Sequence, residues 1–332
     1  MLSSDGVGAW NKTTDYPLHV SVEDCALSGG YVYCVGGYAP SPTNETYFAQ
    51  VSAQGVGAWT NTADYPIPIA EGGCFAHSGY LYCAGGLSDN GSVSGAFFAP
   101  VSSSGIGSWS TTHSLPQKVY DQSCVVSSDD VFCIAGSTSS VYHSTMNSGG
   151  LAQWTTTAGY PMATYGLACA LVQSYVYCAA GYHGAYVNST YYSMVSGSAL
   201  GAWTKGPDYP LKVTGLSCVS GAGSVFCVGG QNASPYIDSA YFATPEAATT
   251  SQSSAATTAT TSTLSQTTWS PTTVSTQTTA SVATSSTQST TTLSSGGIPE
   301  FPAQAPAAVL VTILIVGSFL LSRKNGRDVP KV

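Results

Sequence analysis

Short apolar runs alternate with polar turns through residues 5–247. In residues 17–59 the runs are a segment ending near Cys25, the segment YVYCV, the segment TYFAQV and a last segment bearing Trp59. A glycine-containing turn, a polar loop and the stretch SAQGVG separate them. Short β-rich runs bounded by Gly, Pro, Asn and Ser are typical of strands. The pattern therefore predicts four antiparallel strands in this unit.

The same unit recurs along the chain. Its tryptophans follow one another at intervals of 49, 50, 45 and 49 residues and stand at Trp10, Trp59, Trp109, Trp154 and Trp203. A fixed period in this range indicates a solenoid, a propeller or an array. Radial repetition of four-stranded antiparallel sheets is how a β-propeller limits its exposed edges. We therefore expect an all-β propeller over residues 5–247, with five visible repeats.

The two ends of this repeat region complement each other. The fifth repeat runs from Pro210 through SAYFATP without a tryptophan strand, whereas the chain begins with such a strand, GVGAWNKT, and no repeat before it. If the N-terminal strand completes the last blade, the ring closes with five blades. The alternative is that upstream repeats are missing and the ring has six or seven. The complementary ends favour five.

Each repeat carries two cysteines nine positions apart, as in CALSGGYVYC (25–34). A two-residue turn at Gly29-Gly30 places Cys25 and Cys34 directly opposite each other at a non-hydrogen-bonded site, where Cα atoms about 4.5 Å apart suit a disulfide. The same count centres the other turns on Ser78-Gly79, Ser128-Asp129, Gln173-Ser174 and Ala222-Gly223. The predicted disulfides are Cys25–Cys34, Cys74–Cys83, Cys124–Cys133, Cys169–Cys178 and Cys218–Cys227.

Other uses of the cysteines fit less well. Structural zinc sites favour ligands about two to four residues apart, and no histidine accompanies these pairs. Redox-active pairs usually have the spacing Cys-x-x-Cys. Because structural disulfides persist in oxidising compartments, we expect the domain to lie outside the cytosol.

The repeats resemble the kelch-repeat family. A hydrophobic strand is followed by a diglycine, then by a Tyr-containing strand and a tryptophan. The diglycines are Gly36-Gly37, Gly85-Gly86 and Gly229-Gly230, and the third and fourth repeats read IAG (134–136) and AAG (179–181). The chain departs from the family in its cysteine pairs, in lacking an Arg before the first strand, and in its YP dipeptides. The resemblance implies a kelch-like propeller and no particular activity.

Beyond the repeats the composition changes twice. Between residues 249 and 295, 32 of 47 positions are Ser or Thr, and none is charged. Such a segment is typical of a disordered, O-glycosylated stalk, which we place at residues 248–297. Residues 305–322 form an uncharged apolar run that predicts a transmembrane helix. The basic tail, residues 323–332, then lies on the cytoplasmic side.

Sequence features at both ends of the chain indicate where in the cell the protein is expected. The stretch IPEFP (298–302) resembles the motif before the C-terminal helix of archaeal surface proteins of the PEF-type sorting class, which implies that the helix could be replaced by a lipid. MLSSDGVGAW has neither a basic region nor an apolar run, so we expect that the signal peptide is missing from this chain. The prediction is a cell-surface, single-pass membrane protein with its propeller outside.

Charge excludes one class of partner. Arg323 and Arg327 are the only arginines, and residues 1–247 hold four lysines against fourteen Asp and Glu. Nucleic acid needs many cationic contacts and is not expected as a partner.

Binding is expected in the loops between the second and third strands, which differ between repeats while the framework recurs. Tyrosine stacks on sugars or peptides, and Asp supplies directional hydrogen bonds. The candidate residues are Tyr38, Asp89, Tyr182, His183, Tyr236 and Asp238. Glycosylation sequons lie in or near the same loops at Asn44, Asn90, Asn188 and Asn232, with a fifth at Asn11. Glycans there would crowd a binding site.

The predicted function is binding or adhesion at the cell surface, with an extracellular glycan or protein as ligand. A passive component of the cell envelope is the first alternative. A surface hydrolase or a copper oxidase of the galactose-oxidase type is the second. The sequence shows no paired carboxylates, no nucleophile–base set and no phosphate loop. Its histidines stand at non-equivalent positions, and SSDGVGAW (3–10) departs from a sialidase Asp-box at Val7. We therefore predict neither catalysis nor a cofactor or metal.

Overall fold

The computed structural model describes residues 2–3, 6–7, 12–233 and 236–245. All regular secondary-structure elements within these residues are β-strands. The described residues therefore contain no helix long and apolar enough to cross a membrane. The predicted stalk, transmembrane helix and basic tail lie outside the described residues, and so do Trp10 and Asn11. The predicted propeller is thus the part of the chain that the structure tests.

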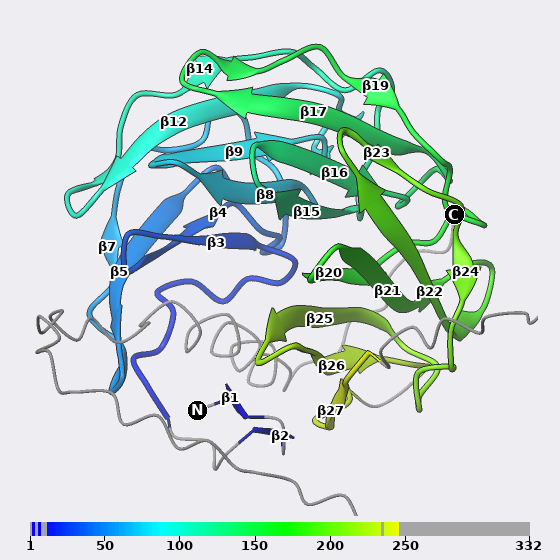
Figure 1. The fold of residues 1–332 in the computed structure, drawn as a ribbon. Helices are drawn as coiled ribbons and strands as arrows, with labels where there is room; N and C mark the ends of the chain where they lie inside the picture. Colours follow the sequence, from blue (N-terminus) through cyan, green and yellow to red (C-terminus); the bar gives the residue numbers. More distant parts are fainter. Residues whose placement is uncertain (1, 4–5, 8–11, 234–235, 246–332) are drawn as a thin grey trace, which may run out of the picture. The chain divides into compact units, whose positions relative to one another are not determined.

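Five antiparallel sheets of three or more strands follow one another around a common centre (Figure 1). We number them as blades 1 to 5, and together they form a five-blade β-propeller, as the repeat pattern predicts. The innermost strand of each blade is its first: β3 (Asp24–Ser28), β8 (Gly73–His77), β15 (Ser123–Ser127), β20 (Ala168–Val172) and β25 (Thr214–Gly221).

The second and third strands form the body of each blade. The second strands are β4 (Tyr31–Val35), β9 (Tyr80–Ala84), β16 (Asp130–Ile134), β21 (Tyr175–Tyr182) and β26 (Ser224–Gln231). The third strands are β5 (Thr46–Ser52), β12 (Ala96–Ser102), β17 (Val141–Asn147), β22 (Tyr186–Ser196) and β27 (Ala240–Ala243). Second strands are buried along most of their length. In blades 2 to 4, side chains from both neighbouring blades pack against them.

In blades 1 to 4 the third strand also pairs with two short segments. Its end forms a hairpin with β6 (Gly55–Val56), β13 (Gly105–Ile106), β18 (Gly150–Leu151) or β23 (Ala199–Leu200). Its outer edge pairs with the fourth strand, which is β7 (Thr60–Asn61), β14 (Ser110–Thr111), β19 (Thr155–Thr156) or β24 (Thr204–Lys205). The fourth strand therefore begins directly after each tryptophan, one residue later than the predicted Trp-bearing strand.

Two small hairpins lie outside this pattern. β10 (Leu87–Ser88) pairs with β11 (Gly91–Ser92) in the loop between the second and third strands of blade 2. β1 (Leu2–Ser3) pairs with β2 (Gly6–Val7) at the start of the chain.

The predicted disulfides are all present. In blade 1, Ser28 pairs with Tyr31 across the turn and Cys25 pairs with Cys34, as the residue count predicts. The Cα atoms of the bridged cysteines lie 4.0 to 4.1 Å apart in the five blades. The register arises locally, because Gly29 and Gly30 both adopt the positive φ that a tight hairpin turn requires. No free cysteine occurs in the described residues.

In blades 1 and 2 the diglycine lies at the contact with the next blade. Gly37 donates its N–H to the carbonyl oxygen of Ile69 at 2.8 Å. A Cβ atom at Gly36 would collide with that same oxygen, and both glycines have positive φ. The diglycine is therefore needed because it lets two backbones approach closely.

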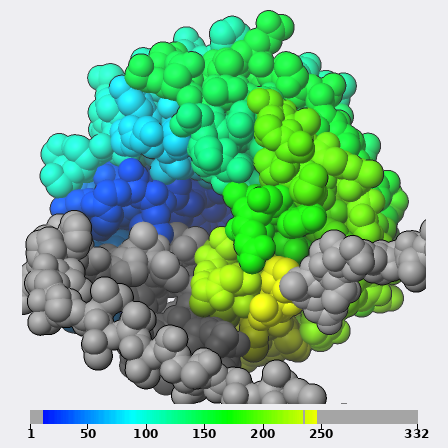
Figure 2. Space-filling model, viewed as in Figure 1, coloured from blue at the N-terminus to red at the C-terminus, as the bar shows by residue number. Residues whose placement is uncertain are grey.

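The apolar core lies between the blades, where side chains fill the space (Figure 2). Four buried clusters join blades 1 to 2, 2 to 3, 3 to 4 and 4 to 5. Representative pairs within them are Val35 with Leu81, Tyr82 with Val131, Ile134 with Val176, and Ala170 with Val225. The other side of blade 1 has a fifth, smaller cluster, formed by blade 1 and Tyr16 without any described residue of blade 5.

Candidate functional site

One face of the propeller, which we call the loop face, gathers the loops that follow the second strands. These loops pair with the segments that lead into the first strands: Tyr38 bridges to Ser21, Leu87 to Ala70, and Tyr182 to Tyr165. The cysteine hairpin turns lie at the other ends of the strands, where the turn residue Gly30 accepts a hydrogen bond from Val51 N–H at 2.8 Å. The variable loops therefore share one face, as predicted.

The six predicted binding residues are all exposed on this face. Tyr38 and Tyr182 occupy equivalent positions, directly after Gly37 and Gly181. Their exposed fractions are 46% and 38%, and that of Tyr236 is 43%. Three of the exposed aromatic side chains in the described residues therefore lie on this face.

The six residues come from four blades and are not joined in one cluster. Asp89 lies at the tip of the β10–β11 hairpin of blade 2. His183 is tied to its own blade, since its Nδ1 lies 2.7 Å from the carbonyl oxygen of Ala163. Tyr182 packs edge-on against Tyr186, with ring centroids 5.4 Å apart. The structure thus places the six residues apart from one another on a broad surface.

The centre of the ring holds acidic residues that are not among the predicted site residues. The residue three positions before the first cysteine of each blade has a φ between 53° and 65°, and these residues are Val22, Glu71, Asp121, Gly166 and Gly215. Their backbones join successive blades: Glu71 N–H donates to Val22 O at 3.1 Å, and Asp121 N–H to Glu71 O at 2.9 Å. Blades 2 and 3 thus place acidic side chains where blades 4 and 5 have glycine.

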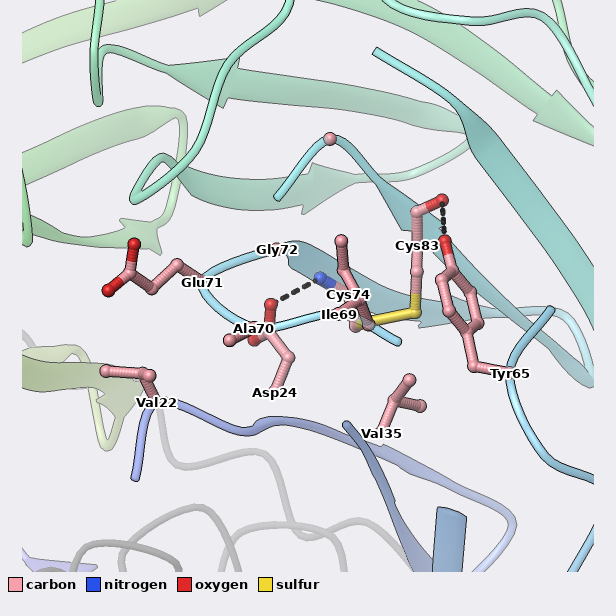
Figure 3. Close-up of a pocket in the computed structure, with 11 residues that line it drawn as sticks. Val22, Asp24, Val35, Tyr65, Ile69, Ala70, Glu71, Gly72, Cys74 and Cys83 are labelled. Carbon is pink, nitrogen blue, oxygen red and sulfur yellow. Dashed lines mark hydrogen bonds between the residues drawn. A yellow bond between two sulfur atoms is a disulfide. The ribbon is translucent and has the colours of Figure 1, made fainter. Parts of the chain in front are cut away.

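Two further carboxyl groups belong to blade 1. The Asp24 carboxylate accepts a hydrogen bond from the Cys74 N–H of blade 2 at 3.0 Å (Figure 3). Glu23 precedes it, and its Oε2 is buried without a hydrogen-bond partner in the described residues. In Figure 3 the Glu71 side chain points away from the Cys74–Cys83 disulfide.

Burial controls the titration of these four groups. It raises the pKa of Glu23 and of Glu71 from 4.5 to about 7, and the Asp121 charge adds to the effect on Glu71. It also raises the pKa of Asp24 from 3.8 to about 7, against the lowering effect of the Cys74 N–H. The pKa of Asp121 rises to about 6. Part of this acidic group is therefore protonated at neutral pH.

An aromatic pair adjoins the acidic centre. Tyr120 and Tyr165 immediately precede Asp121 and Gly166, and their ring centroids lie 5.6 Å apart. Burial raises the pKa of Tyr120, and Tyr165, Glu71 and Asp121 add to the effect. The loop face thus combines hydroxyl-bearing rings and carboxyl groups, a set that donates and accepts hydrogen bonds and can stack on a ring.

The cavity between blades 1 and 2 is too small for an organic ligand. Asp24, Tyr65, Ile69 and the Cys74–Cys83 disulfide line it (Figure 3). Its volume of about 10 Å³ is about what one water molecule needs. Contact with any larger partner would have to take place on the loop surface.

Two of the histidines pair with carboxylates. His143 Nε2 lies 2.6 Å from Asp130 Oδ1 and His77 Nε2 lies 2.9 Å from Asp129 Oδ1. No group of three or more His, Cys, Asp or Glu is arranged to hold a metal ion in the described part of the chain.

Four of the predicted glycosylation sequons lie in the loops of the loop face. Asn90 is exposed beside Asp89, whereas Asn44, Asn188 and Asn232 are partly buried in the loops of blades 1, 4 and 5. Asn11 lies outside the described residues.

Comparisons with known proteins support the fold. No protein-family model and no curated protein sequence matches the chain. A solved structure entitled "Structure of YjhT" is similar, with a TM-score of 0.58 at 14% sequence identity, covering 68% of this chain and 82% of that one. At this identity the likeness concerns the fold alone.

Proposed function

We propose that this chain is a binding or adhesion module of the cell surface, which contacts an extracellular glycan or protein through the loop face. The observation that carries the proposal is the exposure of Tyr38, Tyr182 and Tyr236 from three blades on one face. Tyrosine offers a large contact area at a small cost in side-chain entropy. Because the sheets beneath are joined by buried clusters, these side chains project from a rigid base.

The chemistry of the face narrows the ligand class. Glu71 and Asp121 make its centre acidic, and the described residues hold no arginine to pair with phosphate or carboxylate. A neutral sugar or a neutral-to-basic protein segment therefore suits the face better than an anionic ligand.

The setting of the domain is part of the proposal. The repeats are kelch-like, the propeller is glycosylated and exported, and the Ser/Thr-rich stalk and C-terminal helix, with its PEF-like motif, hold it at an archaeal-type cell surface. The five disulfides favour an extracellular location. β27 runs from the loop face toward the hairpin turns, so a stalk that follows it would leave the loops facing away from the membrane.

Binding of the full chain in detergent micelles to a glycan array and to candidate surface proteins tests the proposal. Replacing Tyr38, Tyr182 and Tyr236 by alanine should weaken a saturable interaction about tenfold each, the equivalent of about 1.4 kcal/mol. Met194→Ala is the matched control, since Met194 is 47% exposed near the hairpin turns. The proposal fails if the tyrosine variants bind like the wild type. Lateral self-assembly without a saturable ligand would favour the passive envelope role.

A further inference from the structure

Four tyrosines from blades 3 and 4 follow one another on the loop face. Tyr120 and Tyr165 precede the first strands of these blades, and their ring centroids lie 5.6 Å apart. Tyr165 N–H donates to Tyr182 O at 2.9 Å, and Tyr182 N–H donates to Tyr165 O at 2.8 Å. Tyr182 in turn pairs with Tyr186, with ring centroids 5.4 Å apart. We call these four residues the tyrosine row.

The three members of the row in blade 4 lie on adjacent backbone segments. Residues directly opposite each other in antiparallel pairs have their side chains on the same side of the sheet, with Cβ atoms about 4.5–5.5 Å apart. Tyr165, Tyr182 and Tyr186 therefore stand side by side. Tyr182 is exposed and the other members of the row are partly exposed. The row is thus an accessible aromatic surface that leads from the centre of the ring outward along blade 4.

The propeller framework does not require tyrosine at these positions. Four residues before the first cysteine, blades 3 and 4 have Tyr120 and Tyr165, whereas the other blades have Ser21, Ala70 and Thr214. Four residues after the second cysteine, blades 1 and 4 have tyrosine, and the other blades have Leu87, Ser137 and Gln231. Because residues of such different size and polarity occupy the same positions of one fold, packing alone does not account for the tyrosines.

Most of the row lies in an uncharged part of the chain. No Asp, Glu, Lys or Arg stands between Asp130 and Lys205, a stretch that includes Tyr165, Tyr182 and Tyr186. A charged group of a ligand that lost its hydration on this surface would gain no opposite charge in return. The row therefore favours a neutral ligand.

The inner end of the row meets the acidic centre. Tyr120 directly precedes Asp121, and the charges of Glu71 and Asp121 add to the effect of burial and of Tyr165 in raising the pKa of Tyr120. Carboxyl groups accept hydrogen bonds from hydroxyl donors, and their charge repels anions. This end of the row therefore suits a ligand with hydroxyl groups and disfavours one that carries carboxylate or sulfate.

The backbone along the row is already paired. Besides the two bonds between Tyr165 and Tyr182, Tyr120 O accepts from Ser137 N–H at 3.1 Å. A peptide that binds by strand addition needs free backbone donors and acceptors at a sheet edge. A saccharide needs ring faces for its apolar C–H groups and polar groups at the rims of those rings, and tyrosine supplies both. The row therefore fits a saccharide better than an extended peptide.

We propose that the tyrosine row binds a neutral oligosaccharide, whose successive sugar rings stack along Tyr120, Tyr165, Tyr182 and Tyr186. Hydroxyl groups of the sugar nearest the centre of the ring donate to the carboxyl groups there. This inference rests on the proposed function and names its ligand class. It also adds three residues to the predicted binding set and makes blades 3 and 4 the main contact.

Substitutions that copy other blades test the row. A glycan array with neutral, sialylated and sulfated oligosaccharides selects the tightest neutral one, which is then titrated by calorimetry into the full chain in detergent micelles. Tyr120→Ala copies Ala70 and Tyr165→Thr copies Thr214, so both variants should fold normally, which thermal unfolding checks. Each should raise Kd about tenfold, because it removes a ring on which a sugar stacks.

Three further variants separate stacking from other effects. Tyr186→Ala should also raise Kd about tenfold, whereas Tyr186→Phe, which keeps the ring, should stay within about threefold of the wild type. Met194→Ala is the matched control, because Met194 lies on the same strand near the hairpin turns, and it should leave Kd unchanged.

Two properties of binding test the ligand class. Kd should change less than about twofold between about 0.1 and 1 M NaCl, although the Debye length falls from about 10 to 3 Å. The corresponding monosaccharide should bind at least about tenfold more weakly than the oligosaccharide, because it covers a single ring.

The possible failures can be told apart. If Tyr38→Ala and Tyr236→Ala weaken binding and the row variants do not, the row is wrong and the proposed function stands. An anionic glycan or a protein as the ligand would refute the ligand class and also leave the proposed function standing. Binding that appears only in Asn188→Gln would assign the row to a glycan of the chain itself and overturn the proposal. The absence of any saturable ligand would overturn the proposed function together with this inference.

Discussion

The four central carboxyl groups predict that the domain loses stability as the pH rises through neutrality. Glu23, Asp24 and Glu71 have pKa values of about 7 in the folded chain, against ordinary values of 4.5, 3.8 and 4.5. Between about pH 4.5 and 7 the folded chain therefore holds protons that the unfolded chain has released. Stability is greatest below this window and falls as the pH rises through it.

The size of the effect follows from the number of protons taken up on folding. One excess proton lowers the free energy of unfolding by about 1.4 kcal/mol for each pH unit. For a domain of this size, about 1 kcal/mol corresponds to a change in Tm of about 2–4 °C. We therefore expect Tm to fall by at least about 3 °C per unit between about pH 5 and 7.

Thermal unfolding followed by circular dichroism at constant ionic strength measures this slope. Asp24→Asn keeps an oxygen that can accept from Cys74 N–H but carries no charge, so it should flatten the slope. Asp208→Asn is the control, because Asp208 is an exposed carboxylate that pairs with Lys205 at 3.2 Å. A Tm that is constant or rises from about pH 5 to 7, or equal slopes in the two variants, would refute the reasoning.

Two further substitutions test the repeated framework. Thr112→Val should cost about 1–3 kcal/mol in urea unfolding, because it leaves the Leu151 N–H without Thr112 Oγ1, its acceptor at 2.7 Å; Thr111→Val, at the exposed neighbouring position, should cost much less. Glu71→Gly should raise stability by about 1 kcal/mol, since it relieves a positive-φ residue and removes a buried carboxyl. Glu71→Gln removes the charge but keeps the φ strain, so a Gln variant as stable as the Gly variant would show that strain contributes nothing.

The blades and disulfides could be predicted because the information is local. A two-residue turn determines the pairing of every residue outward from it, so Cys25 and Cys34 had to meet. The first residue of the fourth strand was harder to predict from the sequence. Each of Trp59, Trp109, Trp154 and Trp203 donates its indole N–H to a backbone carbonyl that lies 41 to 46 residues earlier in the chain; Trp109 Nε1, for example, donates to Ala63 O at 3.1 Å. The strand therefore starts one residue later than the aromatic marker indicates.

The acidic centre could not be found from the spacing of carboxylates in the chain. Glu71 and Asp121 are fifty residues apart, and the packing of consecutive blades brings them together. A usable signal exists in the repeat itself. The position three residues before the first cysteine is glycine in the last two repeats and acidic in the second and third. Glycine at this position in some repeats indicates that the backbone must adopt a positive φ there. An acidic residue at the same position in other repeats indicates that the side chain can vary.

That constraint distinguishes this position from the loops. Glu71 and Asp121 keep a positive φ that glycine adopts at no steric cost, and their carboxyl groups are also poorly hydrated. Both features oppose stability, and glycine at the equivalent positions of blades 4 and 5 shows that the fold does not need them. Strain and buried charge that the framework does not require are concentrated at functional positions in proteins. We therefore expect the tyrosines of the loop face to hold a ligand. We expect that ligand to make its polar contacts with the acidic centre between blades 2 and 3.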